Sequence, residues 1–103
     1  MIEFKRQDLL QTGGNTLIKT EVTVLCKTGL HARPANEFTK TASKYNSDIF
    51  IEFKGKKFNA KSIIHVMAAG ISFGSKICIV ADGDDEVEAA NKLIGLIESN
   101  FGE

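Results

Sequence analysis

Apolar and polar residues alternate over residues 21–26, and this alternation predicts the first strand of the chain. The segment is rich in β-branched residues, which suit a pleated and half-buried surface. Val22, Val24 and Cys26 fall on one face of the predicted strand. A threonine–glycine pair follows and ends the pattern.

Apolar residues at spacings of three and four predict a helix that begins near Pro34. Proline suits the first turn of a helix, where its missing N–H is not needed. The predicted apolar stripe consists of Ala35, Phe38, Ala42 and Tyr45.

Two short apolar runs, residues 49–53 and 57–59, flank a Lys-Gly-Lys turn and predict a β-hairpin. A short helix is predicted over residues 63–69, with Ser62 as its N-cap and Gly70 as its stop. A fourth strand is predicted over residues 76–81. The last helix has a predicted stripe of Val87, Ala90, Ile94, Ile97 and Phe101.

The predicted order of elements is β-α-β-β-α-β-α, which favours an α+β sandwich with the helices on one face of the sheet. Residues 1–19 precede the regular pattern and contain a Thr-Gly-Gly-Asn breaker run. We therefore expect an N-terminal extension over residues 1–19 and a single domain over residues 20–103.

Composition narrows the function classes. The 103 residues carry 13 Lys and Arg against 13 Asp and Glu, and this balance argues against a nucleic-acid binder. No apolar run approaches the ~20 residues of a membrane-spanning helix, and no secretion signal opens the chain. We expect a cytoplasmic protein.

Strand alternation places Cys26 inward and Cys78 outward, so reduced thiols are expected rather than a disulfide.

The densest candidate chemistry is at His31 and Arg33, just before the predicted helix. The positive end of a helix attracts phosphate and favours the neutral, nucleophilic form of an imidazole. Arg33 can bind phosphate oxygens through its fork of donors. A phosphoryl acceptor fits this pattern, and so does an ordinary exposed histidine in a turn. The cysteines and histidines lack metal-ligand spacing, so neither a metal nor a cofactor is expected.

Ser62 also has two interpretations. It is either a helix cap alone or a phosphorylation site at the start of a helix. The neighbouring Ile63, Ile64 and Met67 either belong to the core or form a docking patch.

Residues 29–35, Gly-Leu-His-Ala-Arg-Pro-Ala, resemble the phosphorylation-site signature of the HPr family of bacterial phosphocarriers. Residues 60–64, Ala-Lys-Ser-Ile-Ile, resemble the regulatory-serine signature of its Gram-positive members, at a matching interval. The resemblance implies an open-faced β-sandwich, a four-stranded antiparallel sheet with three helices on one face. It implies that Nδ1 of His31 carries the phosphoryl group, that Arg33 stabilises the phosphate, and that Ile63, Ile64 and Met67 dock partners.

The implied protein is a monomeric reactant in a relay rather than an enzyme. Enzyme I, charged by phosphoenolpyruvate, would phosphorylate His31, and IIA domains of sugar permeases would take the group. HPr kinase/phosphorylase would modify Ser62, and a catabolite-control transcription factor would bind the modified form. A Crh-like regulatory module is the alternative, although Crh carries glutamine at the position of His31. A nitrogen-related relay is a third possibility. The chain departs from the family pattern in its extension and at His65.

Overall fold

The computed structural model describes residues 17–102 of the chain. Four strands within this range form one antiparallel sheet with the spatial order β1-β4-β2-β3. The strands are β1 (Ile18–Thr23), β2 (Asp48–Phe53), β3 (Lys56–Asn59) and β4 (Lys76–Asp82). The predicted hairpin of β2 and β3 is confirmed, and its turn consists of Lys54 and Gly55.

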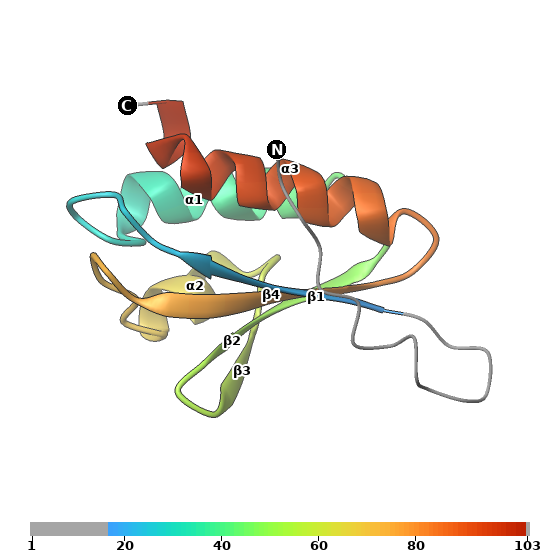
Figure 1. Cartoon of the computed structure of the whole chain (residues 1–103), viewed down its shortest axis with the longest axis horizontal. Coiled ribbons are helices and arrows are strands. Elements are labelled where there is room, and N and C mark those ends of the chain that lie inside the picture. Colours follow the sequence, from blue (N-terminus) through green and yellow to red (C-terminus); the bar gives the residue numbers. More distant parts are fainter. Residues whose placement is uncertain (1–16, 103) are drawn as a thin grey trace.

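Three α-helices pack with this sheet: α1 (Ala32–Ala42), α2 (Ile63–Ala68) and α3 (Glu86–Glu98). Figure 1 shows α1 and α3 lying across the same face of the sheet, and no helix of residues 17–102 covers the other face. A short 3-10 turn, η2 (Asn100–Gly102), follows α3. The open-faced α+β sandwich expected from the sequence is therefore confirmed. None of the helices in residues 17–102 is long and apolar enough to cross a membrane.

The first strand lies upstream of its predicted position, at Ile18–Thr23 instead of residues 21–26. Ile18 is fully buried and pairs with Ala81, so the expected boundary between residues 19 and 20 falls inside β1. Beyond β1, Val24 still bonds the turn before β4: its N–H donates to the carbonyl of Ser75, and its carbonyl accepts the N–H of Gly74. The rest of the expected extension, residues 1–16, lies outside the described residues.

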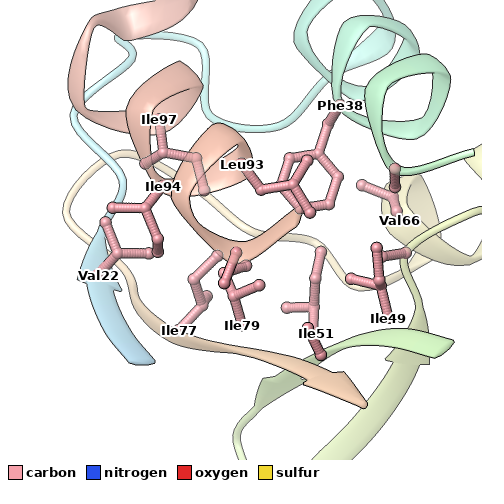
Figure 2. Close-up of a cluster of buried hydrophobic side chains, with 14 of the residues drawn as sticks. Val22, Phe38, Ile49, Ile51, Val66, Ile77, Ile79, Leu93, Ile94 and Ile97 are labelled. Atoms are coloured by element: carbon pink, nitrogen blue, oxygen red, sulfur yellow. The ribbon is translucent and has the colours of Figure 1, made fainter. Parts of the chain in front are cut away.

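The core fills the space between the sheet and the helices. Alternation along β2 and β4 directs every second side chain toward α1 and α3. Figure 2 shows this layer, in which the strand side chains point at the helix side chains. Its labelled members include Ile49, Ile51, Ile77 and Ile79 from the strands, with Phe38, Val66, Leu93, Ile94 and Ile97 from the helices.

The predicted stripe of the last helix is wrong at both ends. Val87 is 40% exposed, because the buried face of α3 passes through Glu86, Ala89 and Leu93 instead. Phe101 lies beyond the end of α3 with a left-handed φ of 58°, so it does not continue the helical face. In an alanine-rich helix, the spacing of apolar residues can place the buried face one residue too early or too late. Packing against the sheet determines which residues are buried.

Cys26 is buried and Cys78 on β4 is half-buried, and the two do not form a disulfide. The outward placement of Cys78 is confirmed, because it alternates with the buried Ile77 and Ile79. Cys26 is buried as expected, but it lies after the end of β1 and so belongs to neither face of the sheet.

The carboxylate of Asp85 links the start of α3 to the segment that follows α1. Asp85 accepts hydrogen bonds from the N–H groups of Asn46 (2.8 Å) and Ser47 (2.9 Å) and from the Ser47 hydroxyl. These bonds lower the pKa of Asp85, the Ser47 hydroxyl contributing most. The ionised carboxylate is therefore the form that the fold prefers.

We expect this junction to make the stability of the protein decrease at acidic pH. The contribution of Asp85 is complete above the pKa of an unfolded aspartate, about 3.9, and is lost as pH falls through its lower folded-state pKa. In thermal melts over an acid series, the melting temperature of Asp85→Asn should therefore fall less steeply below about pH 4 than that of the wild type. The matched control, Asp84→Asn at the exposed neighbour, should keep the wild-type slope. Parallel curves for Asp85→Asn and the wild type would contradict the assignment.

Candidate functional site

A tight turn carries the chain from β1 to the start of α1. The N–H of Gly29 donates to the carbonyl of Cys26 (2.9 Å), and the Cys26 thiol donates to the carbonyl of Gly29 (3.2 Å). Both bonds lie inside the same short segment, so the backbone just before His31 has a defined course.

Gly29 is required because another part of the chain passes directly over it. Its φ is +68°, and a Cβ there would lie 2.4 Å from the carbonyl oxygen of Ile71 and 2.7 Å from Cα of Ser72. The next residue, Leu30, donates its N–H to that same Ile71 carbonyl (3.0 Å). The segment after α2 is thus held against the segment before α1, and Figure 1 shows both at one end of the molecule.

His31 is the N-cap residue of α1, with extended backbone angles of −84° and −164°. Its carbonyl accepts the N–H of Ala35 (2.7 Å), whereas its side chain makes no capping bond. The imidazole is exposed, and the first turn of α1 holds no acidic residue. An incoming anion therefore meets the positive end of an eleven-residue helix without competition from a neighbouring carboxylate.

His31 and Arg33 line one open hollow of about 620 Å³, so the structure brings the two predicted site residues together. The hollow is completed by residues from both connecting segments: Lys27, Thr28, Ala32, Pro34, Ser72 and Phe73. Two cationic side chains, an imidazole and the start of a helix suit the binding of a phosphoryl group, and the open hollow leaves such a group accessible.

The sequence analysis missed the contribution of Ser72 and Phe73, which lie some forty residues from His31 along the chain. Phe73 is 60% exposed, although its turn is fixed by the bonds of Gly74 and Ser75 to Val24. The one available signal was an aromatic residue between two glycines, Gly70 and Gly74, which is an unusual place for a core side chain.

Ser62 lies outside this hollow, at the start of α2. Its hydroxyl oxygen accepts the N–H of His65 (3.3 Å), so the predicted N-cap is confirmed. The opposite end of α2 leads through Gly70 to Ile71, which bonds Leu30. α2 therefore connects the segment containing Ser62 with the turn that positions His31.

The apolar residues that follow Ser62 are on the surface. Ile63 is 36% exposed, Ile64 74% and Met67 44%, whereas Val66 is the buried residue of α2. Of their two interpretations, a core role is therefore wrong for Ile63, Ile64 and Met67. Exposed apolar side chains gathered on one short helix are typical of contact surfaces.

Within residues 17–102, no group of three or more His, Cys, Asp or Glu side chains is arranged to hold a metal ion.

We expect Gly29→Ala to damage the site through its contact with Ile71. The added methyl group should lower the free energy of unfolding by about 2 kcal/mol or more. The matched control is Gly55→Ala, which has a similar φ of +77° and nothing within 4 Å, and should cost about 1 kcal/mol. Urea unfolding of both variants checks the difference. Equal losses would mean that the backbone angle, and not the contact with Ile71, makes Gly29 necessary.

Comparison with known proteins gives consistent matches over the described residues. A family model, PTS-HPr, described as the PTS HPr component phosphorylation site, matches residues 18–99. The HPr-like protein Crh of Halalkalibacterium halodurans is 48% identical over 82 residues, which cover 80% of this chain and 98% of Crh.

Two solved structures place this likeness in three dimensions. The crystal structure of HPr-C-His from Thermoanaerobacter tengcongensis has a TM-score of 0.81 at 50% identity, covering 82% of this chain and 96% of that one. A swapped dimer of Crh from Bacillus subtilis has a TM-score of 0.66 at 45% identity, covering 76% and 90% respectively.

Proposed function

The chain belongs to the HPr family, and from this premise we propose that it is a phosphocarrier that receives a phosphoryl group on His31 from phospho-Enzyme I. It would pass the group to the IIA domains of sugar permeases. The observation that carries the proposal is an exposed imidazole that caps nothing, in the same hollow as Arg33 and Lys27. The partners of this relay imply that the protein works in the cytoplasm.

The chemistry requires little beyond positioning. A lone pair on Nδ1 of His31 attacks phosphorus and forms the N–P bond while the bond between phosphorus and its donor breaks. The second ring nitrogen keeps its proton. Arg33, Lys27 and the N–H groups at the start of α1 compensate the phosphate charge. Because the hollow is open, the group stays accessible to the next acceptor.

The similarity to Crh supports a second candidate, a regulatory module that acts through phosphorylated Ser62. Under this proposal HPr kinase/phosphorylase modifies Ser62, and a catabolite-control transcription factor contacts Ile63, Ile64 and Met67. Their exposure on α2 supports a docking role. The histidine in the hollow favours phosphoryl transfer as the primary function, with Ser62 as its regulatory site. We propose a monomeric carrier. Dimers are described for two relatives, Crh of Bacillus subtilis and an HPr of Thermoanaerobacter tengcongensis.

Replacing His31 tests the carrier function. We expect His31→Ala to abolish acid-labile phosphorylation by Enzyme I and phosphoenolpyruvate while the melting temperature stays near that of the wild type, because the side chain is exposed. His65→Ala removes the other histidine and should accept phosphate normally. Labelling with radioactive phosphoenolpyruvate, followed by acid treatment, measures both. Persistent acid-labile phosphate on His31→Ala would exclude this residue as the carrier.

Arg33 should affect the rate of transfer more than the fold. We expect Arg33→Ala to slow phosphorylation of His31 by about 10-fold or more, because a cation that stabilises the transferring phosphate is lost. Lys40→Ala removes a cation from the last turn of the same helix and should leave the rate unchanged. Rapid-quench kinetics compare the two. Equal rates for both variants would leave Arg33 without a role in transfer.

A charge at Ser62 should regulate docking. We expect Ser62→Asp to weaken Enzyme I binding and slow His31 phosphorylation, because an acidic partner surface meets like charge beside the exposed residues of α2. The effect should shrink in high salt, because screening weakens the repulsion between the charges. Ser62→Ala is the matched control. It should cost about 1 kcal/mol of stability through the lost cap without slowing transfer. If binding by Ser62→Asp at low salt equals that of the wild type, the electrostatic block is wrong.

A further inference from the structure

The face of the sheet that none of the described helices covers is shielded by its own long side chains. Alternation places Phe50, Cys78 and Val80 on this open face. Lys19 reaches across the sheet from β1 to Glu52 on β2 (2.9 Å between Nζ and Oε1), and Lys57 places its Nζ 5.1 Å from the centre of the Phe50 ring. The stems of these side chains cover the apolar strip while their charges remain in water.

One end of this face holds an excess of positive charge. The hairpin turn and the start of β4 surround a hollow of about 430 Å³, which also contains Phe53 and Cys78. Four exposed lysines line it, and we call them the hairpin lysines: Lys54, Lys56, Lys57 and Lys76. Figure 1 shows the β2–β3 hairpin projecting beyond the layer of helices.

The hairpin lysines have no carboxylate of their own. Among residues 17–102, none of the four forms an ion pair. Glu52 is the one carboxylate that lines the hollow, and it is already bonded to Lys19. Four positive charges are therefore concentrated in a small area without local compensation, although the whole chain has a formal net charge of zero.

Lys54 adds an independent observation, because it occupies a backbone conformation that disfavours it. Its φ is +52° in a two-residue turn with Gly55 at +77°, where asparagine, aspartate or glycine is the usual residue. The lysine therefore costs stability, and what it supplies in return is a cation 5.2 Å from the centre of the Phe53 ring. Such a departure from local preference is typical of residues retained for binding.

We propose that the hairpin lysines, together with Phe53 in the same hollow, form a docking site for a short acidic segment of a partner protein that also carries an aromatic side chain. The lysines match the carboxylates of such a segment, and the half-buried Phe53 ring matches its aromatic residue. This site shares no lining residue with the hollow around His31, so a partner could occupy it while His31 is phosphorylated.

A nucleic acid fits this face less well. Glu21, Asp48 and Asp82 are exposed on the same face, and Asp48 lies directly opposite Asp82 across β2 and β4. A long polyanion following the sheet would leave the lysines after a short distance and meet these carboxylates. A short peptide can remain at the hairpin.

The test is a binding titration with the full chain. The probe is a fluorescein-labelled peptide of about ten residues, rich in glutamate and containing one phenylalanine, titrated at about 0.15 M salt and followed by anisotropy. We expect the triple variant Lys54→Gln, Lys56→Gln, Lys57→Gln to weaken binding at least about 10-fold. The control triple variant Lys40→Gln, Lys44→Gln, Lys92→Gln removes the same charge from exposed positions in α1, just after α1 and in α3, and should weaken binding less than about 2-fold.

A single substitution separates binding from folding. Lys54→Asn should raise the melting temperature, because asparagine tolerates the left-handed turn, and should still weaken peptide binding. Three results would overturn the proposal: equal losses in the two triple variants, tighter binding of an oligothymidylate of equal charge, or no peptide binding by the wild type. If the hairpin variant binds the peptide normally but self-associates, the lysines serve only to protect the edge strand β3 from pairing with other chains.

Discussion

The close approach of Gly29 to Ile71 is the contact on which the geometry around His31 depends. It joins the turn that enters α1 to the segment that leaves α2, and the Leu30 hydrogen bond fixes their register. Phe73 and Ser72 reach the hollow of His31 as a result. Leu30 and Ile71 are themselves buried in the core, so apolar packing, hydrogen bonds and one residue without a Cβ together hold the two connecting segments in contact.

Apolar side chains on the two faces of the sheet are shielded from water in different ways. On one face, the isoleucines of β2 and β4 are covered by α1 and α3. On the other, long charged side chains lie over Phe50 and its neighbours. The second solution leaves charge at the surface, and the strand register separates it into a basic hairpin end and an acidic opposite end at Asp48 and Asp82. A net charge of zero conceals this separation.

Features with local causes could be predicted from the sequence. The N-cap at Ser62, the proline in the first turn of α1 and the Lys-Gly hairpin turn each depend on residues within a few positions of one another. His31 and Arg33 share one motif, so their proximity was also predictable. Features decided by distant contacts were not. β1 begins upstream of its predicted position because Ile18 pairs with Ala81 on β4, and Phe73 reaches the site through the hydrogen bond of Leu30 with Ile71.

The junction at Asp85 has a consequence for the order in which the chain folds. Its bonds to Asn46 and Ser47 span 39 and 38 residues, so they close a long loop that contains β2, β3, α2 and β4. A few hydrogen bonds repay the entropy of closing such a loop only after the intervening sheet has formed. We therefore expect the junction to consolidate late, after the folding transition state. Interactions of that kind slow unfolding rather than speed folding, and Asp85 accordingly contributes to how long the native state persists.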